Sequence, residues 1–402
     1  MKSKRIAFLT LALFATLHFQ SSTVCAQGPL APPGVPAPTM KTLNQIEPRI
    51  PISSVPYVIT NAGSYYLTTN LTVINSVSIA ISIQTSDVTL DFCGWTLDGA
   101  GLAIVGVQAV SMTNITVTGG AVRRFQGNGV NVNYVTGAVI TRMQLIGNDT
   151  GLGFAGGARI EDCLAVANAN HGFVGQYNSI PGSILRRCRA IGNGVTGIIA
   201  QHALIEDCLA TQNGTGFVAS GGLTTSHGLN RCVALANTNA GFSLENGQAR
   251  DCVAIENGTG FNLVQRGTLL GCTALNNQTG FVATVGGVIR GSLIQGNRSS
   301  GGVVSNNCIV AANQFSDNAT VTTTQPSLQI LGSGNQILDN SIQGTNDYAI
   351  VCFPTNNVFL RNVATGHALL GYNVTSTGNL ISVASGTDSA TNTNPHVNFS
   401  VP

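Results

Sequence analysis

The feature that most constrains this chain is a repeat of about twenty residues that cysteine marks. Six cysteines follow one another at spacings of 25, 20, 24, 20 and 20 residues: Cys163, Cys188, Cys208, Cys232, Cys252 and Cys272. Met143 occupies the same slot one repeat earlier, and Ser292 occupies it one repeat later. A unit this short cannot bury an apolar face alone, so it must stack on copies of itself.

Other positions keep the same phase. Alanine lies two residues after each of these cysteines and asparagine lies five residues after, while a pair of Gly with an aromatic or apolar residue comes later in the repeat. The asparagines are Asn148, Asn168, Asn193, Asn213, Asn237, Asn257, Asn277 and Asn297, and the pairs end in Phe154, Phe173, Ile198, Phe217, Phe242, Phe261 and Phe281. Stacking therefore predicts interior columns of Cys, Ala and Phe. Asparagine suits a tight turn because it tolerates left-handed backbone, and its amides can bond from rung to rung.

The apolar positions are separated by short polar breaks and show no 3.6-residue period, which indicates short strands joined by turns. The hexapeptides of a left-handed β-helix and the leucine frame of leucine-rich repeats are both missing. We therefore expect an all-β chain that forms a single right-handed parallel β-helix, a solenoid with coils of about 20–25 residues. Its rungs should lie about 4.8 Å apart.

The pattern resembles the right-handed parallel β-helix repeat proteins of the pectin-lyase-like superfamily, of the secreted bacterial type. The likeness covers roughly residues 57–385 and includes the segments 63–67, 70–73, 88–94 and 96–99 before the clean repeats. The resemblance implies the fold. It leaves the activity open, because that superfamily contains lyases, hydrolases, epimerases and proteins without enzymatic activity.

Four segments are expected along the chain. Residues 1–26 have the basic start, apolar run and small residues before Gln27 that are typical of a removable signal peptide. Residues 27–56 are rich in proline and form an N-terminal arm or linker, 57–385 form the β-helix, and 386–402 form a C-terminal tail or cap. The signal peptide predicts secretion, to the extracellular space, the cell surface or the periplasm.

Charge restricts the partners. Removing Lys2, Lys4 and Arg5 with the signal leaves 18 − 3 = 15 basic residues against 16 acidic ones. A nearly neutral chain lacks the basic footprint that nucleic acid requires. No membrane span is predicted after the signal, and no pattern points to a cofactor or a metal. A polysaccharide is a partner that this sequence allows.

Two charged or polar residues precede each repeat cysteine, and the second of them alternates in sign. These residues are Asp162, Arg187, Asp207, Arg231 and Asp251. Both residues of each pair should point outward, and opposite charges one rung apart would attract, so a slip by one coil would bring like charges together. The alternation therefore favours a role in register. The alternative is a carboxylate groove for Ca²⁺ or for acid–base catalysis, but arginine interrupts the acids.

Nine cysteines follow the signal peptide. Stacking would place successive Cα atoms near 4.8 Å, with Cβ atoms at about the same separation, which is longer than a disulfide prefers. We interpret the column as buried thiols that pack as small hydrophobic groups. Near the N-terminus, Asp87, Asp91 and Asp98 are expected to cap turns.

One irregularity indicates a candidate binding site. The two long spacings arise in the same turn of alternate coils, within residues 176–183 and 220–227, and the shorter coil between them carries His202. Tyr177 and His202 each follow a Phe-column residue by four positions, so they should be neighbours. Two longer loops beside a short rung would form a notch with Tyr177, Asn178, His202 and His227. Such groups suit a sugar ring or a proton transfer, and ordinary loop variation is the alternative.

Three functions fit these observations. The first is non-catalytic binding of an extracellular or cell-surface polysaccharide, or service as a rigid surface element. The second is a polysaccharide lyase, hydrolase or epimerase, for which no catalytic residue can be assigned. The third is a periplasmic accessory protein, as in maturation of a metal enzyme. The alternating charges favour the first.

Overall fold

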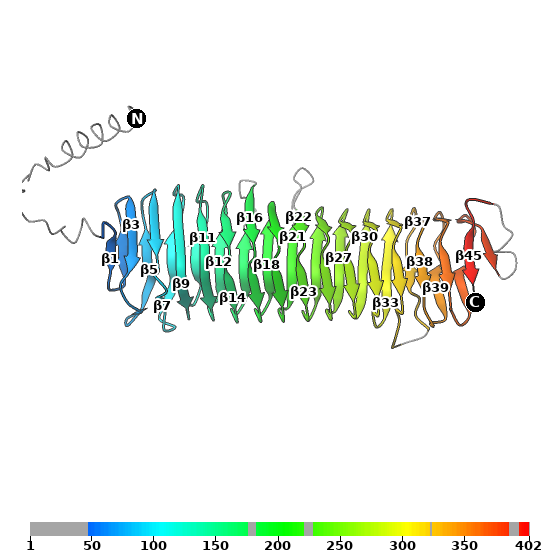
Figure 1. Ribbon diagram of the computed structural model, residues 1–402, viewed down its shortest axis with the longest axis horizontal. Helices are drawn as coiled ribbons and strands as arrows, with labels where there is room; N and C mark the ends of the chain where they lie inside the picture. Colours follow the sequence, from blue (N-terminus) through cyan, green and yellow to red (C-terminus); the bar gives the residue numbers. More distant parts are fainter. Residues whose placement is uncertain (1–46, 176–181, 221–227, 322–323, 386–393, 402) are drawn as a thin grey trace, which may run out of the picture. The chain divides into compact units, whose positions relative to one another are not determined.

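The computed structural model describes residues 47–175, 182–220, 228–321, 324–385 and 394–401. The expected signal peptide and most of the proline-rich arm lie outside these residues. In residues 49–402 the described secondary structure is β-strand, and each strand pairs with its neighbours in parallel. The strands follow the order of the chain along the stack from β1, except that β45 lies between β41 and β44 near the C-terminal end (Figure 1). The predicted all-β parallel solenoid is therefore confirmed.

One sheet receives a single strand from each coil, and we call its outer surface face B. This sheet has 15 strands. They are β2 (Tyr57–Ile59), β5 (Val77–Ile83), β8 (Ala103–Ala109), β10 (Asn128–Val132), β12 (Thr150–Phe154), β15 (His171–Gly175), β18 (Thr196–Gln201), β21 (Thr215–Ser220), β24 (Ala240–Glu245), β27 (Thr259–Gln265), β30 (Thr279–Val285), β33 (Ser300–Asn306), β36 (Leu328–Ile330), β39 (Tyr348–Cys352) and β42 (Leu370–Val374).

The second sheet has 30 strands, because most coils give it two. The first series forms face A1: β1 (Ile50–Ile52), β3 (Gly63–Leu67), β6 (Val88–Asp91), β13 (Arg159–Glu161), β16 (Ser183–Arg186), β19 (Ala203–Glu206), β22 (Gly228–Asn230), β25 (Gln248–Arg250), β28 (Thr268–Leu270), β31 (Val288–Arg290), β34 (Ile309–Ala311), β37 (Gln336–Leu338), β40 (Val358–Leu360) and β43 (Leu380–Ile381).

The second series forms face A2: β4 (Leu71–Thr72), β7 (Thr96–Asp98), β14 (Leu164–Val166), β17 (Arg189–Ile191), β20 (Leu209–Thr211), β23 (Val233–Leu235), β26 (Val253–Ile255), β29 (Thr273–Leu275), β32 (Leu293–Gln295), β35 (Gln314–Ser316), β38 (Ser341–Gln343), β41 (Val363–Thr365), β44 (Val383–Ser385) and β45 (Asn398–Val401). β9 (Ile115–Arg123) and β11 (Val139–Ile146) run through both faces. β45 pairs with both β41 and β44, so paired strands continue after residue 385.

The corner between A1 and A2 is a single residue in the left-handed region. Its φ is 55° at Asp162, 52° at Arg187 and 54° at Asp207. This corner residue lies directly before the repeat cysteine, so its side chain points outward while the cysteine points inward. The alternating charges therefore lie on an exposed edge, as the sequence predicts.

Opposite charges on this edge pair between rungs. Arg187 donates to both oxygens of Asp162 at 2.7 and 2.9 Å, and Arg231 donates to both oxygens of Asp207 at 2.8 and 3.0 Å. These hydrogen bonds from arginine hold the pKa of Asp162 and of Asp207 below the usual value. Exposed ion pairs contribute little stability each, and their proposed role in register remains a prediction.

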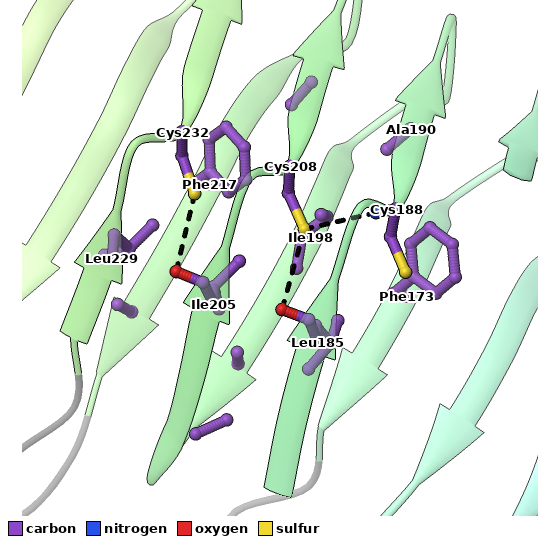
Figure 2. Close-up of a cluster of buried hydrophobic side chains, with 14 of the residues drawn as sticks. Phe173, Leu185, Cys188, Ala190, Ile198, Ile205, Cys208, Phe217, Leu229 and Cys232 are labelled. Atoms are coloured by element: carbon purple, nitrogen blue, oxygen red, sulfur yellow. Dashed lines mark hydrogen bonds between the residues drawn. The ribbon is translucent and has the colours of Figure 1, made fainter. Parts of the chain in front are cut away.

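The cysteine column is buried inside the coil, and every described cysteine has a free thiol. The thiol of Cys208 accepts from the backbone N–H of Cys188 at 3.4 Å and donates to the Leu185 carbonyl at 3.8 Å (Figure 2). Burial raises the pKa of the Cys232 thiol well above its ordinary value. The column thus packs as buried, weakly hydrogen-bonded free cysteines, which agrees with the prediction. The predicted alanine column is also present in register.

The predicted phenylalanine column is correct except at its first member. Phe173 pairs with Leu152 one coil earlier, whereas Phe154 pairs with Gly175 and therefore belongs to another column. A Cβ atom on Gly175 would lie 2.9 Å from the Phe154 ring. The missing side chain of Gly175 provides the space that this ring fills. The spacing of residues within one coil cannot reveal that a large side chain in one rung lies over a glycine in the next.

The asparagines form a buried ladder, as predicted. Asn213 donates its backbone N–H and its side-chain Nδ2 to Oδ1 of Asn237, and Asn237 repeats both bonds to Asn257. The expected left-handed backbone at these asparagines is wrong. The left-handed residue is the one before each of them, such as Gln212 with φ 58° or Ala236 with φ 53°. The asparagine itself is buried, and its side-chain amide bonds to the asparagine of the next rung.

A second ladder continues the cysteine slot toward the C-terminus. The backbone N–H of Ser292 donates to Oδ1 of Asn313, which is followed by Asn340, Asn362 and Asn398 with the same bond. The N–H at this slot therefore needs an acceptor from the next rung. That acceptor is a thiol, a hydroxyl or an amide oxygen, depending on the rung.

Asp91 and Asp98 cap turns as predicted, since each accepts a backbone N–H two residues later. Asp98 is only 2% exposed and also accepts from Arg123 and Arg124. Burial alone would raise the pKa of Asp98. The hydrogen bonds from Arg124, Ala100 and Arg123 together lower the pKa by more than burial raises it, so the pKa is below its usual value.

This arrangement predicts acid sensitivity. A lowered carboxyl pKa stabilises the fold above the unfolded pKa of about 3.9, and the contribution is lost as pH falls through the folded pKa. We expect Asp98→Asn to lower stability by about 1–3 kcal/mol near neutral pH. The difference should decrease as the pH falls below the unfolded pKa of about 3.9 and through the lower folded pKa. Thermal unfolding of both proteins across this pH range measures it, with Asp87→Asn as the exposed control; a constant difference at all pH values would contradict the assignment.

Candidate functional site

Of the four residues expected to form the notch, the structure describes only His202. It occupies the corner between β18 and β19 with φ 55° and is partly buried. Tyr177, Asn178 and His227 lie outside the described residues. The notch itself therefore remains a prediction.

His202 lines a hollow on face A1 that extends from β16 to β28. The hollow has a volume of about 600 Å³. Ile184 and Leu204 supply apolar surface at the end near His202, while Gln248 and Thr268 supply polar groups at the other end. These side chains belong to one outward row of neighbouring strands, so the hollow runs along the stack.

A glycine makes the hollow. Gly228 holds the position between Leu204 and Gln248 in this outward row. A Cβ atom built on Gly228 would meet only Leu204 within 4 Å, at 3.6 Å. The surface therefore drops to backbone level at β22 and rises again on both sides.

Asn230 lines the same hollow and is held from outside it. Its Nδ2 donates to Glu206 at 3.4 Å, and Arg186 donates to the other oxygen of Glu206 at 2.7 Å. The hydrogen bond from Arg186 lowers the pKa of Glu206. Glu206 is therefore an ionised group that orients Asn230, and it is unsuited to act as a general acid.

Arg266 brings positive charge to the hollow. It lies in the left-handed corner before β28, with φ 43°, and is exposed. Among the described residues, no ion pair involves Arg266, and no carboxylate lines the hollow. The residues that precede Gly182 and Gly228 in the sequence, 176–181 and 221–227, also contain no Asp or Glu. A guanidinium in such surroundings is suited to a carboxylate, sulfate or phosphate of a ligand.

One hydroxyl of the lining is engaged elsewhere. The hydroxyl of Ser183 accepts the backbone N–H of Ala158 at 3.1 Å and is buried. Across the part of the chain that the structure describes, no three His, Cys, Asp or Glu side chains are placed to hold a metal ion. The hollow thus offers amide, hydroxyl, imidazole and guanidinium groups beside aliphatic surface, which is a lining suited to binding.

Of the residues that line this hollow, the sequence indicated His202 as a candidate but did not indicate Asn230, Gln248, Arg266 or Thr268. The variation in loop length indicated the turn before face A1, whereas Asn230, Gln248, Arg266 and Thr268 lie on face A1 or beside it. The sequence feature that could have indicated the hollow is Gly228, because the equivalent positions in the neighbouring coils, Leu204 and Gln248, carry outward-facing side chains. That signal requires the register of the strands, which the repeat supplies.

Comparison with known families bears on the hand of the coil. Residues 57–203 match the family described as a right-handed β-helix region. The fold is a parallel β-helix, consistent with the right hand of that family. A comparison with curated proteins gave no match.

Several solved structures are similar in fold. The A-module of mannuronan C-5 epimerase AlgE6 of Azotobacter vinelandii is 16% identical over 85% of this chain and 90% of that chain, with a TM-score of 0.42. A mannuronic acid specific family 6 polysaccharide lyase from human gut microbiota is 12% identical over 86% and 82%, with a TM-score of 0.43. A tailspike protein of E. coli bacteriophage HK620, in complex with a pentasaccharide, is 13% identical over 85% and 72%, with a TM-score of 0.40.

The described part of this β-helix protein includes no helix that is both long and apolar enough to cross a membrane.

Proposed function

We propose that this β-helix protein is secreted and binds an acidic extracellular or cell-surface polysaccharide in the hollow on face A1, without cleaving it. The observation that carries the proposal is the lining of the hollow. Arg266, which forms no ion pair with any residue that the structure describes, lies there beside amide and hydroxyl groups and beside the aliphatic side chains of Ile184 and Leu204. The sequence of residues 1–26 supports secretion.

The chemistry of a sugar acid fits this lining. Its carboxylate would accept from Arg266, and its hydroxyl groups would bond to Asn230, Gln248 and Thr268, while the apolar face of the ring would lie against Leu204. The hollow runs along the stack, so neighbouring sugars of one chain would meet neighbouring rungs.

Cleavage is the competing function. Hydrolysis by two carboxylates requires a pair of acids beside the scissile bond. None of the described lining residues is an acid; Glu206, which bonds to the lining residue Asn230, is itself bonded to Arg186, and Glu245 directly precedes the lining residue Asn246. Lysis or epimerisation would need a base at the hollow, and His202 is the lining residue suited to that role.

The test is retention of the mature protein in gels that contain acidic or neutral polysaccharides, with parallel assays for new reducing or unsaturated ends. We expect retention by an acidic polysaccharide and no new ends. Arg266→Gln should weaken binding by about 10- to 100-fold, because a hydrogen bond to a charged group contributes about 1.5–3 kcal/mol. Arg290→Gln is the control, since Arg290 is exposed on the same face outside the hollow.

Two results would contradict the proposal. Equal retention of wild type and Arg266→Gln would remove the hollow as the binding site. New chain ends that disappear in His202→Ala would show that the protein is an enzyme.

A further inference from the structure

Face A2 carries an unusual set of outward side chains. On seven consecutive strands, from β14 to β32, the middle residue is buried and the two outer residues face outward. The outward residues form two rows: Leu164, Arg189, Leu209, Val233, Val253, Thr273 and Leu293, and Val166, Ile191, Thr211, Leu235, Ile255, Leu275 and Gln295. Leu, Ile and Val supply ten of these fourteen residues. We call these two rows the apolar strip.

The same rungs of face A1 provide an internal comparison. The corresponding fourteen outward residues are Arg159, Glu161, Ile184, Arg186, Leu204, Glu206, Gly228, Asn230, Gln248, Arg250, Thr268, Leu270, Val288 and Arg290. Four of these are Leu, Ile or Val and six are charged, whereas Arg189 is the one charged residue of the apolar strip. Stacking of coils therefore does not require apolar residues on an outer face.

Strands that are apolar on both sides are typical of parallel sheets that are covered on both faces. All the Leu, Ile and Val side chains of the strip remain partly exposed in the described chain. The seven strands extend about 29 Å along the stack, at about 4.8 Å per rung. Contiguous apolar surface on this scale marks an interaction site.

We propose that the apolar strip is the contact between two copies of this chain. With the corner residues on both sides, the strip is about 20 Å wide. Its footprint is then about 600 Å² on each copy, or about 1,200 Å² in total, which reaches the range of stable protein–protein interfaces. Because most of the strip is apolar along its whole length, the same surface of a second copy can cover it, as a two-fold contact requires.

The charged corner beside the strip agrees with such a contact. A two-fold axis parallel to the strands would place the corner columns of the two copies side by side, in opposite directions. If the axis passes between the rungs of Asp207 and Arg231, each Asp faces an Arg of the partner, because the signs alternate. Arg187 would then face Asp251 in the same way. The alternation thus favours this pairing of rungs over a shift by one rung.

The experiment compares the mass in solution of three forms of the mature protein by analytical ultracentrifugation. We expect the wild type to dimerise with a dissociation constant in about the micromolar range or below. Val233→Lys with Leu235→Lys places two charges in the middle of the strip and should weaken the dimer at least about 100-fold. Leu270→Lys with Val288→Lys makes the same two changes on face A1 and should leave the dimer intact.

Circular dichroism of each variant shows whether the β-helix is retained, so loss of the dimer can be separated from loss of the fold. A wild type that stays monomeric at about 100 μM would overturn the proposal, as would a dimer that survives both lysines in the strip. A wild-type monomer that sediments with phosphatidylcholine vesicles would also overturn it, because the strip would then meet lipid. The proposal does not depend on polysaccharide binding.

Discussion

Asn237→Ala should destabilise the β-helix by about 3–5 kcal/mol, because it interrupts the buried ladder at its centre. The side chain of Asn237 accepts two hydrogen bonds from Asn213, at 3.0 and 3.1 Å, and donates to the Ala210 carbonyl at 3.0 Å and to Asn257 at 2.9 Å. The substitution leaves the N–H of Asn213 and the carbonyl of Ala210 inside the stack without these partners. Each buried group that loses its partner costs about 1–3 kcal/mol.

Chemical denaturation followed by far-ultraviolet circular dichroism measures this effect. Asn239→Ala makes the same change two residues away on an exposed turn and should alter stability by less than about 0.5 kcal/mol. Because each coil contacts only its neighbours, the broken ladder should also separate the stack into two blocks that unfold less cooperatively. Similar midpoints for the two variants would mean that the ladder contributes no more than an exposed amide does.

The ladder also illustrates how far the sequence predicts the fold. Regular spacing at Cys163 to Cys272 identifies the coil length, the interior columns and the outward position of Asp162 and Arg187, since these depend only on period and alternation. The same reasoning misplaces the left-handed corner, which lies one residue before each asparagine. Period locates a turn, but the choice of the residue that adopts positive φ depends on where the amide finds its partners.

The candidate site is less predictable for a related reason. His202 is a candidate from the sequence because the spacing of the repeat changes on both sides of it. Asn230, Gln248 and Arg266 come from separate coils and meet only when the strands are in register, and the hollow exists because Gly228 lacks a side chain. A repeat sequence presents each of these as one more variable outward position. The proposed site therefore depends on how residues of neighbouring coils align, and this alignment is not visible within the sequence of any single coil.

The second large effect is expected at the phenylalanine column. Phe242 stacks on Phe217 with ring centroids 4.9 Å apart and an interplanar angle of 5°, and on Phe261 at 4.9 Å and 10°. Its side chain is fully buried. Phe242→Ala removes the ring from between two others and leaves a cavity that the rigid backbone on both sides cannot close. We expect a loss of about 3–5 kcal/mol in the free energy of unfolding.

Phe242→Ile is the matched variant, because the column already accepts isoleucine at Ile198, which pairs with Phe217. It should recover most of the stability that alanine loses, with a remaining cost of about 1–2 kcal/mol from the smaller volume and the lost ring contacts. Denaturation of the three proteins under the same conditions makes the comparison. If isoleucine were as destabilising as alanine, stacking between rings would dominate this column. If both changes were nearly neutral, the coils would be held together by their backbone and asparagine hydrogen bonds, and the interior packing would matter little.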